Sequence, residues 1–307
     1  MSWQLSRWVT PMMFVFGLVS AMGVPTAGQG GSQGGVVPLP MRPYGQLAGC
    51  SEEPARFQPC ALEKAKTYKP PMTPDGHPDF SGHWNRARVT SDNIEEHAEV
   101  VGDPGGKSLV IDPPDGKIPY QPWAAAKKRD NLEQYIAPQA LCFPPGSPRA
   151  AYAPGGYQIL QTPGYLIFMH DFAHAYRVVH TDGRPHVPSN VRMAMGDSRG
   201  RWEGNTLVVD ATNFNSKIWV DNEGNFLSDT VHIVERWTLI APDAISYEAW
   251  IEDPKVFTRP WTVAFGIRRN AEPGYEIWES ACFEGNRGKL PGASSGLKPY
   301  LGVIPPN

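Results

Sequence analysis

The chain has 307 residues, and its 28 basic and 31 acidic residues give a formal net charge of -3 at pH 7. This near balance, without a basic run, argues against nucleic-acid binding and against attachment to a membrane through a polybasic segment. No glycine-rich nucleotide-binding loop is present in the sequence, and we expect no cofactor and a small-molecule partner. Ten tryptophans and 32 prolines are typical of a compact, loop-rich, exported β-protein.

An apolar run at residues 12–24 follows Arg7 near the amino terminus. The run is shorter than the ~20 residues of a membrane-spanning helix, and small residues follow it, as in a secretory signal. We therefore expect residues 1–27 to be a cleaved signal peptide and the mature protein to be periplasmic or secreted, without an integral membrane segment. Residues 47–50 match a lipoprotein box, but residues 25–43 separate this box from the apolar run, which argues against lipidation.

Composition divides the mature chain into two parts. Residues 28–72 are rich in proline and glycine, and we expect a linker there with one short helix at 61–67. Residues 73–307 are expected to form a single β-barrel domain, because all-β barrels of this size are often undivided.

Export also changes how the cysteines are interpreted, because an oxidising compartment favours disulfides over free thiols. Four cysteines allow three pairings, and none has the spacing of a zinc site. Cys50 with Cys60 is the natural local pair, which leaves Cys142 with Cys282. The second bond would hold the irregular first half of the chain against the last strand.

Residues 122–135 predict a helix, because proline stands at the first helical position and three alanines follow closely. Beyond this helix, apolar runs alternate with glycine and asparagine turns, which is the pattern of antiparallel hairpins. The sequence therefore predicts an all-β fold, an antiparallel up-and-down barrel of about eight strands, with a β-sandwich as the alternative. The expected strands are 157–161, 165–170, 175–181, 206–211, 230–240, 244–252, 256–268 and 275–282.

Two turn-like segments carry side chains with possible chemical roles. Residues 196–200 match the G-x-S-x-G nucleophile elbow, but that elbow requires a following helix, and here a strand signal follows. A tight turn is the favoured interpretation. His180 and His186 flank the turn at 182–184, and they either converge on a ligand or only border that turn.

The expected catalytic histidines lie between two predicted strands. His170 and His174 have the i, i+4 spacing of a helical metal pair, and Asp171 lies between them. Because strands flank them, the spacing does not by itself place both rings on one side, and we predict no metal. A hairpin loop at a barrel mouth would let these residues perform acid/base chemistry, and solvated loop histidines are the alternative.

Glu235 is a carboxylate among apolar neighbours. Alternation along residues 230–240 places it on the predicted interior face of a strand. Burial raises the pKa of a carboxyl group and allows it to act as a general acid or base near neutral pH. A structural ion pair with Arg236 or Arg259 is the alternative.

Aromatic residues are frequent in the second half of the chain and supply both core and cavity walls. A barrel of about eight strands has room for one small ligand if its interior side chains are not all large. The residues expected to bind a hydrophobic or aromatic substrate there are Tyr176, Arg177, Trp202, Trp237, Arg259 and Trp261.

Several segments between residues 73 and 286 resemble a large family of uncharacterised exported bacterial proteins. The family usually has histidine where this chain has Phe283, and the resemblance implies a shared fold more than a reaction. Residues 82–84, Gly-His-Trp, are also similar to the G-x-W of lipocalins, which implies a calycin-like barrel. The motifs that carry the family resemblance are GDSRGRWEGNTLVVD at 196–210, ERW at 235–237, DPKVFTRPW at 253–261 and CFEGN at 282–286.

These observations predict an exported enzyme that performs cofactor-independent acid/base chemistry, of the lyase, isomerase or hydratase type, on a hydrophobic or aromatic small molecule. The expected catalytic residues are His170, Asp171, His174 and Glu235. The competing hypothesis is a carrier, in which the same barrel holds an apolar small molecule and the ionisable groups only orient it. A third hypothesis is a filled barrel with a structural role.

Overall fold

The structure is a computed structural model that describes residues 43–87, 91–99, 103–278, 296–303 and 305. The expected signal peptide, Cys282 and the motif that contains it lie outside the described residues. Within the described ranges, no helix has the length and apolarity needed to cross a membrane.

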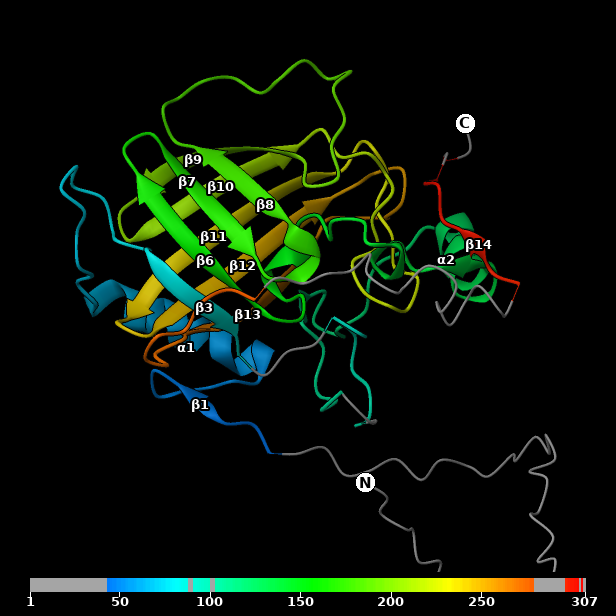
Figure 1. Ribbon diagram of the computed structural model, residues 1–307. Coiled ribbons are helices and arrows are strands. Elements are labelled where there is room, and N and C mark those ends of the chain that lie inside the picture. The colour runs from blue at the N-terminus through cyan, green and yellow to red at the C-terminus, as the bar shows by residue number, and fades with distance from the viewer. Residues whose placement is uncertain (1–42, 88–90, 100–102, 279–295, 304, 306–307) are drawn as a thin grey trace, which may run out of the picture. The chain divides into compact units, whose positions relative to one another are not determined.

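The described chain is built around a closed β-barrel, which confirms the predicted all-β class (Figure 1). Nine strands follow one another around the barrel in sequence order, and the last pairs with the first. The sequence predicts neither β3 nor β9, and the described part of the strand expected at 275–282 is not a strand. The nine are β3 (Gly82–Arg86), β6 (Gly156–Thr162), β7 (Tyr165–His170), β8 (Tyr176–His180), β9 (Asp197–Glu203), β10 (Thr206–Thr212), β11 (His232–Ala241), β12 (Ala244–Glu252) and β13 (Trp261–Arg269).

Neighbouring strands of the barrel are antiparallel except β8 and β9, which run parallel. Their ladder is short and consists of the pairs Val179 with Ser198 and His180 with Arg199. Parallel neighbours require a connection that returns the chain to the starting end of the sheet. Residues 181–196 provide it as a long loop that arches away from the barrel (Figure 1). The sequence predicts an antiparallel barrel, and the long connection 181–196 accounts for its one parallel pair, β8 with β9.

Large side chains fill the interior of the barrel. The ring centroid of Trp237 lies 4.9 Å from that of Phe168, 4.7 Å from that of Tyr247 and 6.1 Å from that of Tyr157. All four residues are 3% exposed or less. Alternation along the strands directs these side chains inward, and a small barrel has little room beyond them. This part of the interior is an aromatic core.

A short hairpin and a helix cover the outside of the barrel near β13. The hairpin consists of β1 (Gln46–Leu47) and β2 (Cys50–Ser51), and the helix is α1 (Pro54–Thr67). Gly266 on β13 permits this close approach, because a Cβ atom there would lie 2.5 Å from Leu47 Cδ2 and 2.9 Å from Phe57 Cζ. A disulfide between Cys50 and Cys60 joins the hairpin to the helix, which confirms the predicted local pair.

Helix α2 (Pro122–Gln134) lies against the connections that follow β10 and β12. Asn131 Nδ2 donates a hydrogen bond to the Gly224 carbonyl at 3.1 Å, and Trp123 Nε1 donates one to the Lys255 carbonyl at 3.1 Å. Cys142 is not a free thiol, but Cys282 lies outside the described residues, and their pairing stays a prediction. The remaining short elements are β4 (Val110–Asp112), β5 (Tyr135–Ile136), β14 (Lys298–Pro299) and the 3-10 helices η1 (Pro138–Leu141), η2 (Arg149–Ala151) and η3 (Phe172–His174).

Candidate functional site

An ion pair joins two sides of the barrel interior. Arg177 on β8 places Nη1 at 2.5 Å from Oε2 of Glu235 on β11. Tyr247 Oη donates a hydrogen bond to Glu235 Oε1 at 2.7 Å, and Arg177 Nε donates one to Ser198 Oγ at 2.8 Å. Glu235 is 0% exposed and Arg177 is 4% exposed. Because water is excluded from both charges, each one is stabilised chiefly by the other and by these hydrogen bonds.

Glu235 faces the interior, as the alternation predicts, but Arg177 is its partner. The two partners considered from sequence, Arg236 and Arg259, instead form ion pairs with surface carboxylates. Burial and, next, the charge of Glu235 raise the pKa of the Tyr247 phenol well above its ordinary value. The phenol therefore keeps the proton that it donates to Glu235.

His170 lies at the end of β7, and the charge of Arg177 affects the pKa of its imidazole. Burial first, and the Arg177 charge second, lower the pKa of the His170 imidazole to about 3. The ring is therefore neutral near pH 7, and so weak a base accepts a substrate proton poorly. Among the described residues, His170 Nε2, Arg177 Nη2 and Tyr157 Oη are buried polar atoms without a hydrogen-bond partner.

A cleft of about 530 Å³ opens on the barrel wall where β8 meets β9, and we name it the β8–β9 cleft. Its volume lies within the range of small-molecule sites, roughly 300–1,000 Å³. Arg177 and Ser198 belong to its wall, so the cleft borders the buried ion pair. Residues of the connection 181–196 form another part of the wall. The charged residues and histidines on the wall are His174, Arg177, His180, Arg184, Asp197 and Arg199.

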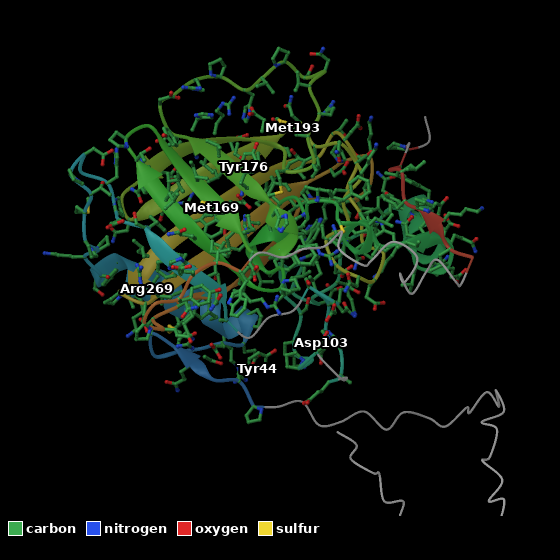
Figure 2. The ribbon with its side chains drawn as sticks, viewed as in Figure 1. Tyr44, Asp103, Met169, Tyr176, Met193 and Arg269 are labelled. Atoms are coloured by element: carbon green, nitrogen blue, oxygen red, sulfur yellow. A yellow bond between two sulfur atoms is a disulfide. The ribbon has the colours of Figure 1, made fainter. Side chains whose placement is uncertain are left out.

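An apolar groove of about 380 Å³ adjoins the cleft, and we name it the Met169 groove. His174, Ala175 and Tyr176 line both cavities. Figure 2 shows Met193 of the cleft, the shared Tyr176 and Met169 of the groove along one face of the barrel. The structure thus brings four of the expected site residues to one connected surface: His170, His174, Tyr176 and Arg177.

The other expected site residues do not line these cavities. Trp202 follows Ser198 by four positions on β9, which separates them by roughly 13 Å along the strand. Its ring stacks on His77, with ring centroids 4.9 Å apart. The inward side chains of Ser198 and Trp202 thus lie at different positions along the strand. Two side chains that both point into the barrel therefore need not belong to one site. Glu235 lies behind Arg177, Trp237 and Trp261 are core side chains, Arg259 is on the surface, and Asp171 is partly exposed beside η3.

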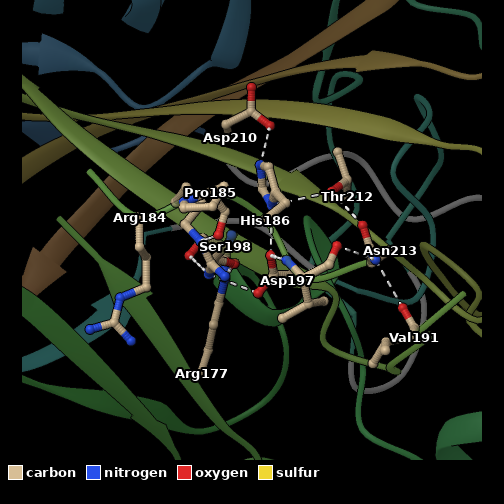
Figure 3. A network of polar contacts seen from close by, with 12 residues as sticks. Arg177, Arg184, Pro185, His186, Val191, Asp197, Ser198, Asp210, Thr212 and Asn213 are labelled. Carbon is tan, nitrogen blue, oxygen red and sulfur yellow. Dashed lines mark hydrogen bonds and ion pairs between the residues drawn. The ribbon is translucent and has the colours of Figure 1, made fainter. Parts of the chain in front are cut away.

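A chain of histidines and carboxylates lies on the outer face of β9, β10 and β11. Figure 3 shows His186 between Asp197 and Asp210. His186 Nδ1 lies 2.7 Å from Asp197 Oδ2, and His186 Nε2 lies 3.1 Å from Asp210 Oδ1. The second oxygen of Asp210 contacts His232 Nε2 at 3.1 Å. These contacts hold the connection 181–196 against the barrel, and this connection forms part of the cleft wall.

Ser198 and Arg199 are cleft residues that the sequence does not identify, because 196–200 is interpreted as a turn. The signal for a strand is present in the printed sequence: small or aromatic residues alternate with charged residues over 197–203. His180, which precedes the predicted turn at 182–184, and Arg184 of that turn both line the cleft, whereas His186 does not.

Among the described residues, no group of three or more His, Cys, Asp and Glu side chains is arranged to hold a metal ion. Comparison of the chain with protein-family models, with curated proteins and with solved structures yields no match. The geometry of the cleft and the groove therefore carries the functional proposal.

Replacing Glu235 by leucine should destabilise the protein by about 3–5 kcal/mol, because Arg177 would remain buried without a counter-charge. The double variant Arg177→Met/Glu235→Leu should recover most of this loss, since neither charge then remains in the barrel. Arg236→Met, which removes a surface ion pair from the same strand, is the matched control and should cost less than about 1 kcal/mol. Urea unfolding of all four proteins measures these differences. A double variant as unstable as Glu235→Leu would contradict this account of the pair.

The contact between His232 and Asp210 makes stability depend on pH. Their hydrogen bond is the main cause that raises the pKa of His232 and lowers the pKa of Asp210, and the charge of Glu252 adds to the first shift. A raised histidine pKa contributes stability that is fully present below the unfolded value of ~6.5 and is lost as pH rises through the folded value. The contribution of Asp210 is present above its ordinary pKa and is lost as pH falls through its lowered value.

We therefore expect His232→Gln to destabilise the protein more at about pH 5.5 than at about pH 8.5. The two side chains are 35% and 34% exposed, and solvent screening limits the difference to less than about 1 kcal/mol. Thermal unfolding of both proteins at the two pH values measures it. Equal destabilisation at both would mean that the contact is not charged in the folded protein.

Proposed function

We propose that this protein binds a small molecule with an acidic group and an apolar body, and that the acidic group lies in the β8–β9 cleft. The composition of the cleft wall supports this proposal. Guanidinium groups recognise carboxylates through paired, charge-assisted hydrogen bonds. The wall contains Arg184, Arg199, His174 and His180, and its one carboxylate is Asp197. Arg184 and Arg199 pair with Asp182 and Asp197 and also face the cleft, whereas the charge of Arg177 is neutralised by Glu235.

The electrostatic field at His180 favours an anionic ligand. Burial lowers the pKa of this imidazole, and the charges of Arg184 and Arg199 lower it further, each more strongly than Asp182 or Asp197 raises it. The arginines therefore outweigh the carboxylates at this point of the wall. A smaller cavity of about 190 Å³ beside His180 is also lined by Arg184 and Arg199.

The state of the buried ionisable groups favours binding over acid/base catalysis. Glu235 is enclosed by Arg177 and Tyr247 and is 0% exposed, which separates its carboxylate from a ligand in the cleft. His170, with a pKa of about 3, is a weak base. A carrier is therefore the first proposal.

Cofactor-independent acid/base catalysis, of the lyase, isomerase or hydratase type, is the second proposal, and His174 is the residue that favours it. Ala173 and His174 have φ angles of 58° and 49°. Non-glycine residues in this region cost about 1–3 kcal/mol each and are frequent at functional sites. Mass spectrometry of a bound acid before and after incubation separates the proposals: conversion that His174→Gln abolishes favours the enzyme, and an unchanged ligand favours the carrier.

We also propose that the protein acts after export, in the periplasm or outside the cell. The apolar run at 12–24 and the Cys50–Cys60 disulfide support this location. Amino-terminal sequencing of periplasmic protein should find cleavage between Gly23 and Gly28. Recovery of the uncleaved chain in the cytoplasm would contradict this.

Arg184→Gln should weaken binding of an aromatic carboxylate and leave binding of its neutral amide unchanged. The side chain of Arg184 is 53% exposed, and we expect the loss of such a solvent-screened contact to raise Kd about fivefold at most. Calorimetric titration with 2-naphthoate and 2-naphthamide measures both affinities. Arg236→Gln removes a surface arginine that lies outside the cleft wall and serves as the control. Equal weakening of both compounds, or the same effect in the control, would count against the cleft as the anion site.

A further inference from the structure

The outer face of β7 and β8 carries apolar side chains, although the outer face of a barrel wall is ordinarily polar. On β7, alternation directs Tyr165, Ile167 and Met169 outward. Next to them, Tyr176 is 69% exposed and Trp278 is 74% exposed. Contiguous exposed apolar surface marks a binding site, whereas single exposed apolar side chains are ordinary.

This surface is hollowed into the Met169 groove, which shares a rim with the β8–β9 cleft. His174, Ala175 and Tyr176 belong to both walls. Among the described residues, the groove wall contains no carboxylate, lysine or arginine, whereas the cleft wall contains three arginines. A molecule that occupies both cavities therefore needs one charged end and one apolar end.

We propose that the ligand is an amphipathic carboxylate with an unbranched hydrocarbon tail. Its head lies among the arginines of the β8–β9 cleft, and its tail lies along Met169 and Trp278 in the groove. This inference depends on the proposed function and adds the chemical class of the ligand. The shared wall of the two cavities favours this occupant, because a short polar anion would leave the groove uncovered, and a neutral apolar molecule would make no charge-assisted contact with the edges of Arg184 and Arg199 that face the cleft.

Calorimetric titration with butyrate, hexanoate, octanoate and decanoate, each below its critical micelle concentration, tests the inference. Complete burial of one methylene lowers Kd about fourfold. Because the groove is open to solvent on one side, we expect Kd to fall about twofold to fourfold per methylene. The effect should level off once the tail fills the groove.

Two matched variants separate the groove from the general apolarity of this face. Met169, 39% exposed, lines the groove, whereas Leu160, 38% exposed, points outward on the neighbouring strand β6 and is not part of the groove wall. Met169→Asn should flatten the dependence on chain length. Leu160→Asn should preserve the dependence. Arg184→Gln should weaken all four acids by a similar factor, and thermal unfolding verifies that each variant is folded.

The outcomes distinguish the two proposals. Acids that bind with a dependence on Arg184 but without a dependence on chain length, or with a dependence that Met169→Asn leaves intact, overturn the tail assignment and retain the anion site. Binding that is insensitive to Arg184 at every chain length overturns both. Primary alcohols of the same lengths serve as neutral probes, and alcohols that bind as tightly as the acids overturn the assignment of a carboxylate.

Discussion

The ion pair between Arg177 and Glu235 crosses the barrel interior from β8 to β11, and the arrangement of the strands around it depends on this contact. Removing two charges from water costs several kcal/mol per ion, and a close opposite charge with satisfied hydrogen bonds must offset that cost. Tyr247 and Ser198 supply two such bonds, whereas Arg177 Nη2 is buried without a hydrogen-bond partner. Because Ser198 belongs to β9, the network joins β8 to β9 through side chains at the seam where their backbone ladder is shortest.

The arginines on the inner and outer sides of the barrel wall at β8 and β9 differ in how fully their charges are neutralised. Inside the barrel, the one guanidinium of β8 is neutralised, and its surroundings are aromatic and dry. Outside, Arg184 and Arg199 have one edge on Asp182 or Asp197 and another on the cleft. Arg177 thus has a structural role, because Glu235 neutralises its charge inside the barrel. Arg184 and Arg199 keep part of each guanidinium group facing the cleft.

The sequence of a single segment predicts those elements whose formation depends on that segment alone. The alternation over 230–240 predicts the strand and the inward side chain of Glu235, and the proline before three alanines predicts α2. The partner of Glu235 depends on which strand stands opposite inside the closed barrel, and no periodicity within one segment encodes that. Strand β9 is missed because Gly196 and Gly200 are typical of turns. The cleft exists because one strand pair is parallel, and this follows from the path of the connection 181–196, whose conformation depends on contacts with distant residues such as Asp210.

The connection 181–196 has a further consequence for how proteins of this architecture diversify. It contributes Arg184, Val187 and Met193 to the cleft wall, yet it supplies no strand to the barrel and is attached through side-chain contacts with Asp197, Asp210 and Asn213. Surface connections tolerate insertion and replacement better than barrel strands do. The part of the cleft wall that this connection supplies can therefore change during evolution while the nine strands and their buried ion pair stay constant.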